Sequence, residues 1–265
     1  MGMIPRAELP GLADHVRIHH GPRALLEDFF YAAEQAARAR GVRLRLRSDL
    51  GALVDFNARE RRHWYRISPL FDPGFSNVSP QNSFWIEGRD DAGDIVATQA
   101  CRRFHWSGTT LGEECRSLRL FYADPARMAA PGETCAMTAP SARSIAGRVA
   151  YSGSGWYRPD FRGRELSAIL PRISRACALA RWGTDTTISF VEDVLIEKGV
   201  VARYGYRRVE HAIAWRGRGG GDLTMAVLTM PRSELIADLV AFLSGALQLV
   251  GRPQHRHAGE EALVS

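Results

Sequence analysis

The segment between Trp156 and Tyr206 constrains the fold of this chain more than any other. A strand ends near Trp156, and an Arg-Gly-Arg turn then leads into a helix predicted over Glu165–Arg181. The apolar residues of this helix recur at intervals of three and four, so that they form one face toward a core: Leu166, Ile169, Leu170, Ile173, Cys177 and Ala180. Pro171 removes one backbone donor from the helix and predicts a kink.

The turn before this helix is suited to an anion. Arg162-Gly163-Arg164 stands at the helix N-terminus, where unpaired N–H groups and about half a positive charge are available. The two arginines add full charges. Taken alone, the turn is equally compatible with an ordinary exposed loop in an arginine-rich chain. Three neighbouring features favour phosphate binding: Pro159 before the turn, the long helix after it and the later Gly205-Tyr206 pair.

The rest of the chain mixes strands and helices. Strands are predicted over 42–46, 83–87, 95–101, 144–156, 186–191, 208–215 and 223–230, and helices over 23–40, 48–64, 194–203 and 235–250. The strand over 144–156 is expected to be interrupted near 152–155. In the 101–141 segment, 118–122 is predicted as a strand and 125–140 as a loop. We find no linker that divides the chain, and we expect one domain over 22–250 with a flexible segment 1–21 and a disordered tail 251–265.

Composition excludes several classes of protein. With 45% hydrophobic and 24% charged residues, the chain matches an ordinary globular protein rather than a disordered or fibrous one. The net charge is +6, and Lys198 is the only lysine among the 35 basic residues. Because the arginines are spread along the chain, we expect no nucleic-acid partner. The Arg61–Arg66 segment mixes arginines with aromatics, but a helix end that packs its aromatics explains it equally well.

The termini and cysteines indicate a cytoplasmic protein. Met1–Pro10 has no apolar run of the length that a signal peptide needs, and Leu235–Val250 has the spacing of a helix packed on a core rather than of a membrane span. The four cysteines are widely separated, without ligand spacing to histidine. We therefore expect no disulfide framework, no metal site and no membrane span.

The segment 156–206 resembles the GCN5-related N-acetyltransferase (GNAT) superfamily of acyl-CoA-dependent acyltransferases. Members often carry a Pro-x-Tyr-Arg-Gly-x-Gly-x-Gly turn, an apolar helix and a later Tyr-x-x-x-Gly-Phe ending. Here Pro159-Asp160-Phe161-Arg162-Gly163-Arg164-Glu165-Leu166-Ser167 occupies the turn, and Gly205-Tyr206 matches the Gly-Phe pair. Glu165 and Ser167 stand at the two later glycines.

The resemblance implies an α/β (α+β) fold with a mixed, mostly antiparallel central sheet and helices on both faces. It implies that the strand before the turn separates from its neighbour, and that pantetheine pairs with that strand near Trp156 and Tyr157. The diphosphate of acetyl-CoA or another acyl-CoA would bind the backbone of Arg162, Gly163, Arg164, Glu165, Leu166 and Ser167.

The resemblance also implies an acid and a base. The family's tyrosine four residues before the glycine is Val201 here, and Tyr204 is the nearest hydroxyl along the chain. A base belongs near the point where the strands separate, for which Glu192 and Asp193 are the best placed. Each has a structural alternative, since Tyr204 suits a helix end and the two acids suit a helix N-terminus. Glu113 and Glu114 could face a substrate cleft or belong to a loop.

Three functions remain open at this point. The first is transfer of an acyl group from acyl-CoA to an amine of a small molecule or peptide, by a monomer or a homodimer. The second is a protein of the same fold that binds or senses without chemistry, because Val201 and Glu165 depart from the family pattern. The third is an acyltransferase that takes a long acyl chain from CoA or a carrier protein, with 101–141 lining the pocket.

Overall fold

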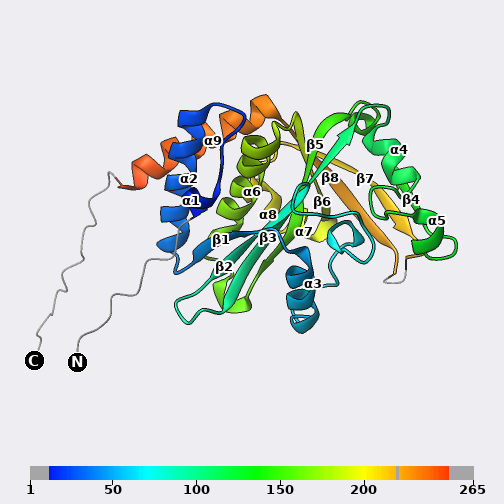
Figure 1. The fold of residues 1–265 in the computed structure, drawn as a ribbon, viewed down its shortest axis with the longest axis horizontal. Coiled ribbons are helices and arrows are strands. Elements are labelled where there is room, and N and C mark those ends of the chain that lie inside the picture. Colours follow the sequence, from blue (N-terminus) through cyan, green and yellow to red (C-terminus); the bar gives the residue numbers. More distant parts are fainter. Residues whose placement is uncertain (1–11, 219–220, 251–265) are drawn as a thin grey trace, which may run out of the picture.

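The computed structural model describes residues 12–218 and 221–250 (Figure 1). The helices are α1 (Leu12–His15), α2 (Arg23–Arg38), α3 (Leu50–Arg59), α4 (Leu111–Arg116), α5 (Pro125–Met128), α6 (Leu166–Trp182), α7 (Asp193–Glu197), α8 (Val200–Tyr204) and α9 (Arg232–Val250). The strands are β1 (Arg43–Arg47), β2 (Ser83–Arg89), β3 (Ile95–Trp106), β4 (Thr134–Met137), β5 (Gly147–Tyr157), β6 (Thr186–Glu192), β7 (Arg208–Arg216) and β8 (Leu223–Pro231).

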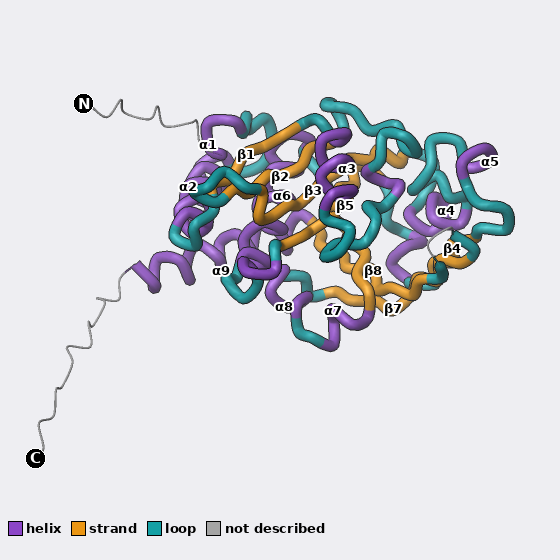
Figure 2. Tube along the Cα trace, turned by 90° about the horizontal axis from the view of Figure 1, so that it is seen from below, coloured by secondary structure: helices purple, strands orange, loops and turns teal. Residues whose placement is uncertain are grey.

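One mixed sheet organises the described part of the molecule. Its strand order is β1-β2-β3-β5-β6-β8-β7-β4, and every neighbouring pair is antiparallel except β5 and β6. One face packs against α2, α6, α8 and α9, and the other against α3, α4 and the loops around them. Figure 1 shows α2, α6 and α9 gathered at one end of the molecule and α4 and α5 at the other, and Figure 2 shows the same arrangement from below. The predicted fold class is therefore confirmed.

The parallel strands β5 and β6 separate soon after they meet. Their pairing consists of Val149 with Thr186, Ala150 with Thr187 and Tyr151 with Ile188. Beyond Tyr151, β5 continues to Tyr157 paired only with β3, while β6 continues to Glu192 paired only with β8. One backbone edge of β5 is consequently left without a strand partner over residues 152–157. This is the separation that the resemblance implies.

A β-bulge lies in that unpaired part of β5. Thr98 pairs with Trp156 and Ala100 with Gly153, so that Gln99 alone faces the two residues Ser154 and Gly155. Ser154 adopts a left-handed φ of 50°, which is unusual for a residue with a side chain. The predicted interruption near 152–155 is thus a bulge within one continuous strand.

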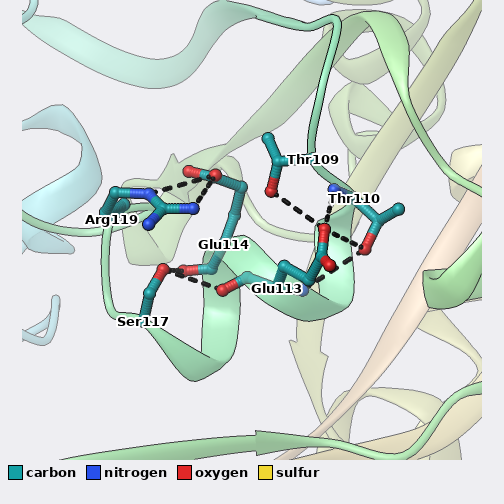
Figure 3. A network of polar contacts seen from close by, with 6 residues as sticks. All are labelled: Thr109, Thr110, Glu113, Glu114, Ser117 and Arg119. Carbon is teal, nitrogen blue, oxygen red and sulfur yellow. Dashed lines mark hydrogen bonds and ion pairs between the residues drawn. The ribbon is translucent and has the colours of Figure 1, made fainter.

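The 101–141 segment differs most from its prediction. Residues 118–122 form turns rather than a strand, and the strand β4 was not foreseen. In α4, Glu113 closes a capping box with Thr110, and Glu114 pairs with Arg119 at 2.7 Å (Figure 3). Both carboxylates therefore hold the loop together, which is the structural alternative for these two residues.

Several element boundaries also differ. The helix predicted over 194–203 is split into α7 and α8 at Gly199, whose φ is 66°. The helix predicted to reach residue 64 ends at Arg59. Within the segment expected to be flexible, Leu12 is fully buried in α1. Residues 1–11 and the tail 251–265 lie outside the described part of the chain, so those predictions stand as made.

Candidate active site

The turn before α6 presents a run of free backbone donors. The N–H groups of residues 163–167 donate no hydrogen bond to any described residue. Gly163 and Glu165 both adopt left-handed conformations, with φ of 80° and 58°. Alternation of this kind turns successive N–H groups toward a common point and makes an anion-binding concavity. The concavity coincides with the N-terminus of α6, where the helix dipole adds positive potential.

The two arginines of the turn add to this potential. The Arg164 guanidinium lies 4.0 Å from the centre of the Phe161 ring, and its Nη1 donates to the carbonyl of Arg40 at 3.4 Å. Arg162 donates from Nε to the carbonyl of Tyr157 at 3.2 Å. Both residues are exposed, and neither pairs with a carboxylate in the described part of the chain. Each guanidinium therefore keeps free N–H groups for a ligand.

Glu165 keeps the backbone shape of a glycine. A left-handed conformation costs a residue with a side chain about 1–2 kcal/mol. Its carboxylate lies 2.5 Å from Arg40 Nη2, so its charge is compensated by an arginine at the end of α2. Because the carboxylate is paired, the backbone donors on either side of it stay available to an anion. The residues of this turn thus fit a diphosphate.

The two aromatic residues that end β5 face opposite sides of the sheet. Trp156 is 4% exposed and packs on Trp64 with ring centres 5.8 Å apart, and on Phe56 at 5.2 Å. Tyr157 packs on the α6 side, and its buried hydroxyl has no partner among the described residues. Burial raises the pKa of Tyr157 well above its usual value. Both side chains anchor β5 while its backbone edge toward β6 remains free.

Glu192 is the carboxylate available at the separation. It ends β6, it is half-buried, and its side chain makes no hydrogen bond or ion pair within the described residues. Its cross-strand partner Met225 is buried on the α3 side of the sheet, so Glu192 faces that side. Asp193, the other predicted candidate, is 2.9 Å from His211 Nδ1. The structure therefore favours Glu192 over Asp193 as a free base.

Tyr204 lies on the other side of the sheet. It ends α8 and packs against the core under α6, where burial raises the pKa of its hydroxyl. Its backbone carbonyl accepts a hydrogen bond from Arg175 at 2.6 Å. Val201, at the position of the family's tyrosine, is buried and 4% exposed. The two predicted catalytic residues are thus held on opposite faces of the separating strands.

Sequence reasoning missed the residues at the base of the separation. Tyr151 and Phe190 meet there edge to face, with ring centres 5.2 Å apart. It also missed Arg175, which is fully buried in α6 and reaches both Tyr204 and Asp238 of α9. Arg175 lies opposite the apolar face that the spacing predicts for this helix, so no local signal indicated that a cation is buried there.

No group of histidine, cysteine and acidic residues in the described part of the chain is arranged to hold a metal ion. Among the described helices, none has both the length and the apolar character needed to cross a bilayer.

Comparison with known proteins finds similarity only among solved structures. No protein-family model and no curated protein matches the chain. The GNAT domain of S. lividans PAT is 15% identical, covers 72% of this chain and 90% of its own, and superposes with a TM-score of 0.40. Mycobacterium smegmatis RimJ in complex with CoA-disulfide is 10% identical, with coverages of 76% and 88% and a TM-score of 0.43. Aminoglycoside acetyltransferase AAC(6')-Ib with coenzyme A and kanamycin is 13% identical, with coverages of 73% and 96% and a TM-score of 0.39.

Because these TM-scores lie below 0.5, the fold is assigned from the strand order rather than from the superpositions. Only β5 and β6 run parallel, they are joined through α6, and they separate after three residue pairs. A mostly antiparallel sheet in which the strand before the turn separates from its parallel neighbour is the fold that the resemblance to the GNAT superfamily implies.

Proposed function

We propose that this protein transfers an acyl group from acyl-CoA to an amine. The observation that supports it best is the run of free N–H groups over residues 163–167, placed directly after the strand whose edge is unpaired. A diphosphate needs several converging donors, and an extended amide-containing arm needs a free strand edge. The chain supplies the free strand edge and, directly after it, the converging donors. Coenzyme A needs the two next to each other, because its pantetheine arm is attached to its diphosphate.

The reaction joins an amine nitrogen to the thioester carbon and breaks the carbon–sulfur bond. The amine must lose a proton, and the departing thiolate must gain one. The Glu192 carboxylate faces the α3 side and has no partner among the described residues, so it is the base that we assign, directly or through one water. A tyrosine hydroxyl is protonated at neutral pH, and burial raises the pKa of Tyr204 further, so we assign it as the proton donor. Their positions on opposite faces suit an amine that arrives from one side and a sulfur that leaves on the other.

The acceptor would be a small molecule or a peptide with an amine, approaching past α3 and the turn that follows it. Trp64, which stacks on Trp156, lies in that turn. Cytoplasmic location and the possibility of a homodimer remain predictions from the sequence.

Binding of coenzyme A tests the site. Arg162→Ala combined with Arg164→Ala should weaken the affinity for CoA and acetyl-CoA in isothermal titration by about tenfold, because two charge-assisted contacts are lost while the backbone donors remain. Arg127→Ala with Arg143→Ala removes the same charge from exposed positions in the 101–146 segment, and its affinity should match the wild type. Equal affinities for the two double variants would place the phosphate site elsewhere.

A second candidate function is binding without chemistry. Val201 is aliphatic and buried where the family has a hydroxyl, which favours this reading over an altered acid. Wild-type protein that binds CoA but acylates no member of a broad amine panel would support it. Release of free thiol from acetyl-CoA in the presence of an amine would contradict it.

A further inference from the structure

Two aromatic rings close the space between β5 and β6 where their pairing ends. The last paired residues are Tyr151 and Ile188, and continuing this register brings Gly153 level with Phe190. Tyr151 and Phe190 lie on the α3 side of the sheet, since Ile188 and Val227, their cross-strand partners, are buried there. An acyl group carried into the separation would meet this pair first.

Gly153 makes room for the Tyr151 ring. A Cβ atom at Gly153 would stand 2.7 Å from Tyr151 Cε1, so the ring lies directly over the glycine. From there it meets Phe190 edge to face, with centres 5.2 Å apart and planes at 88°. Burial raises the pKa of Tyr151, and a hydrogen bond with the Phe190 backbone opposes that shift. The ring and its hydroxyl thus bridge the two separating strands.

The pair is packed against the 101–141 segment, which would line the pocket in the long-chain alternative. Phe121, from that segment, lies 6.5 Å from Phe190 and stacks on Trp215 at 3.9 Å. Phe71 packs on Tyr151 at 5.7 Å. Phe71 and Phe121 are fully buried, whereas Phe190 is partly exposed. The 101–141 segment therefore fills this side of the sheet, and Phe190 is the ring that borders open space.

The α6 side is closed by polar packing. Ser152 on β5 shares a hydrogen bond of 2.8 Å with Ser174 on α6, and Gln99 donates to Ser152 at 3.0 Å. All three side chains are buried. A chain of many methylenes would have to displace these hydrogen bonds without replacing them, which is unfavourable. The α6 side therefore offers no favourable path for a long acyl group, and on the α3 side the rings of Tyr151 and Phe190 stand in its way.

We infer that Tyr151 and Phe190 set the length of the acyl group and restrict the donor to short chains, of acetyl or propionyl size. This inference rests on the proposed function. The two rings act as a specificity determinant, because an added methylene with no space to enter lowers affinity about tenfold or more. The two rings belong to β5 and β6 and are held by residues packed on these strands, so the limit can be measured without an acceptor.

Isothermal titration of CoA, acetyl-CoA and octanoyl-CoA tests the inference without an acceptor. The wild type should bind acetyl-CoA at least about tenfold more tightly than octanoyl-CoA. Phe190→Ala opens the space beside Tyr151 and should reduce that ratio by about tenfold or reverse it. Tyr151→Phe keeps the ring and removes only the hydroxyl, so its ratio should equal that of the wild type.

The outcomes distinguish failure of the length limit from failure of the proposed function. Equal wild-type affinities for acetyl-CoA and octanoyl-CoA would overturn the length limit and leave the proposed function intact. A folded Phe190→Ala variant with the wild-type ratio would do the same. Failure to bind any of the three ligands would overturn both. If Phe190→Ala does not fold, Phe190→Leu retains most of the packing and should shift the ratio in the same direction, and an unchanged ratio would count against the inference.

Discussion

Replacement of Asp238 should destabilise the protein strongly, because it leaves a buried charge without its anion. Asp238 of α9 lies 2.9 Å from Arg172 Nη2 and 3.2 Å from Arg175 Nη2. The Arg175 side chain is fully buried, and its Nε and Nη1 have no partner among the described residues. Without Asp238, its charge would be met only by the carbonyl of Tyr204 and the face of the Tyr206 ring, 4.6 Å away.

Removing one partner of a buried ion pair costs about 3–5 kcal/mol. We therefore expect Asp238→Ala to lower the free energy of unfolding by about that amount, and to lower the Tm by roughly 6–12 °C for 3 kcal/mol in a domain of this size. The assay is urea denaturation followed by circular dichroism, with the Tm as a second reading. The loss should be larger than that of any exposed ion pair.

Glu27→Ala is the matched control. Its partner Arg23 lies 3.4 Å away, and both side chains are more than half exposed. Such pairs contribute about 0–1 kcal/mol. Adding Arg175→Met to Asp238→Ala should restore part of the stability, since the uncompensated charge is removed. A loss below 1 kcal/mol for Asp238→Ala, or no recovery in the double variant, would refute the electrostatic account of this cluster.

Two further outcomes follow from single side chains. Glu192→Gln should lower kcat for acyl transfer about 100-fold or more, with little change in KM for acyl-CoA. Asp193→Asn is the control, because Asp193 is paired with His211, and its kcat should stay near the wild-type value. Similar losses in both variants would contradict the assignment of the base. Burial raises the pKa of Tyr206 to about 12, whereas the ordinary pKa of tyrosine is about 10. The neutral hydroxyl therefore contributes its full stability below pH 10. Between pH 10 and 12 the protein loses about 2–3 kcal/mol of that stability. Unfolding free energies measured from pH 8 to 11 should fall above pH 10 in the wild type and less steeply in Tyr206→Phe; parallel curves would rule out this contribution.

Sequence alone predicted the parts of the fold whose signals are local. The apolar spacing of α6 located that helix to within one residue at each end, and the strands predicted over 83–87 and 95–101 begin at the first residues of β2 and β3. Each of these features depends on contacts between residues close in sequence.

The features that escaped prediction depend on contacts between distant segments. Residues 118–122 have the composition of a strand, but their apolar side chains are buried through turns that pack Phe121 on Trp215. β4 is paired with β7, far along the chain, and no local pattern specifies that partner. In the site, the residues of the turn could be named from a motif, whereas Tyr151 and Phe190 meet only once β5 and β6 are aligned.

Glu165 shows why a departure from a motif need not abolish the site that the motif builds. The functional requirement at this position is a left-handed backbone that directs N–H groups toward an anion, and glycine is the usual residue because it adopts that backbone without strain. Here a glutamate adopts it, with φ of 58°, and its carboxylate is paired with Arg40 rather than left facing the donors. The adjacent Arg164 also contacts the Arg40 carbonyl, so the end of α2 contacts the turn through both residues. The substitution therefore changes the energy of the turn and its dependence on α2, while the geometry that an anion would bind is retained.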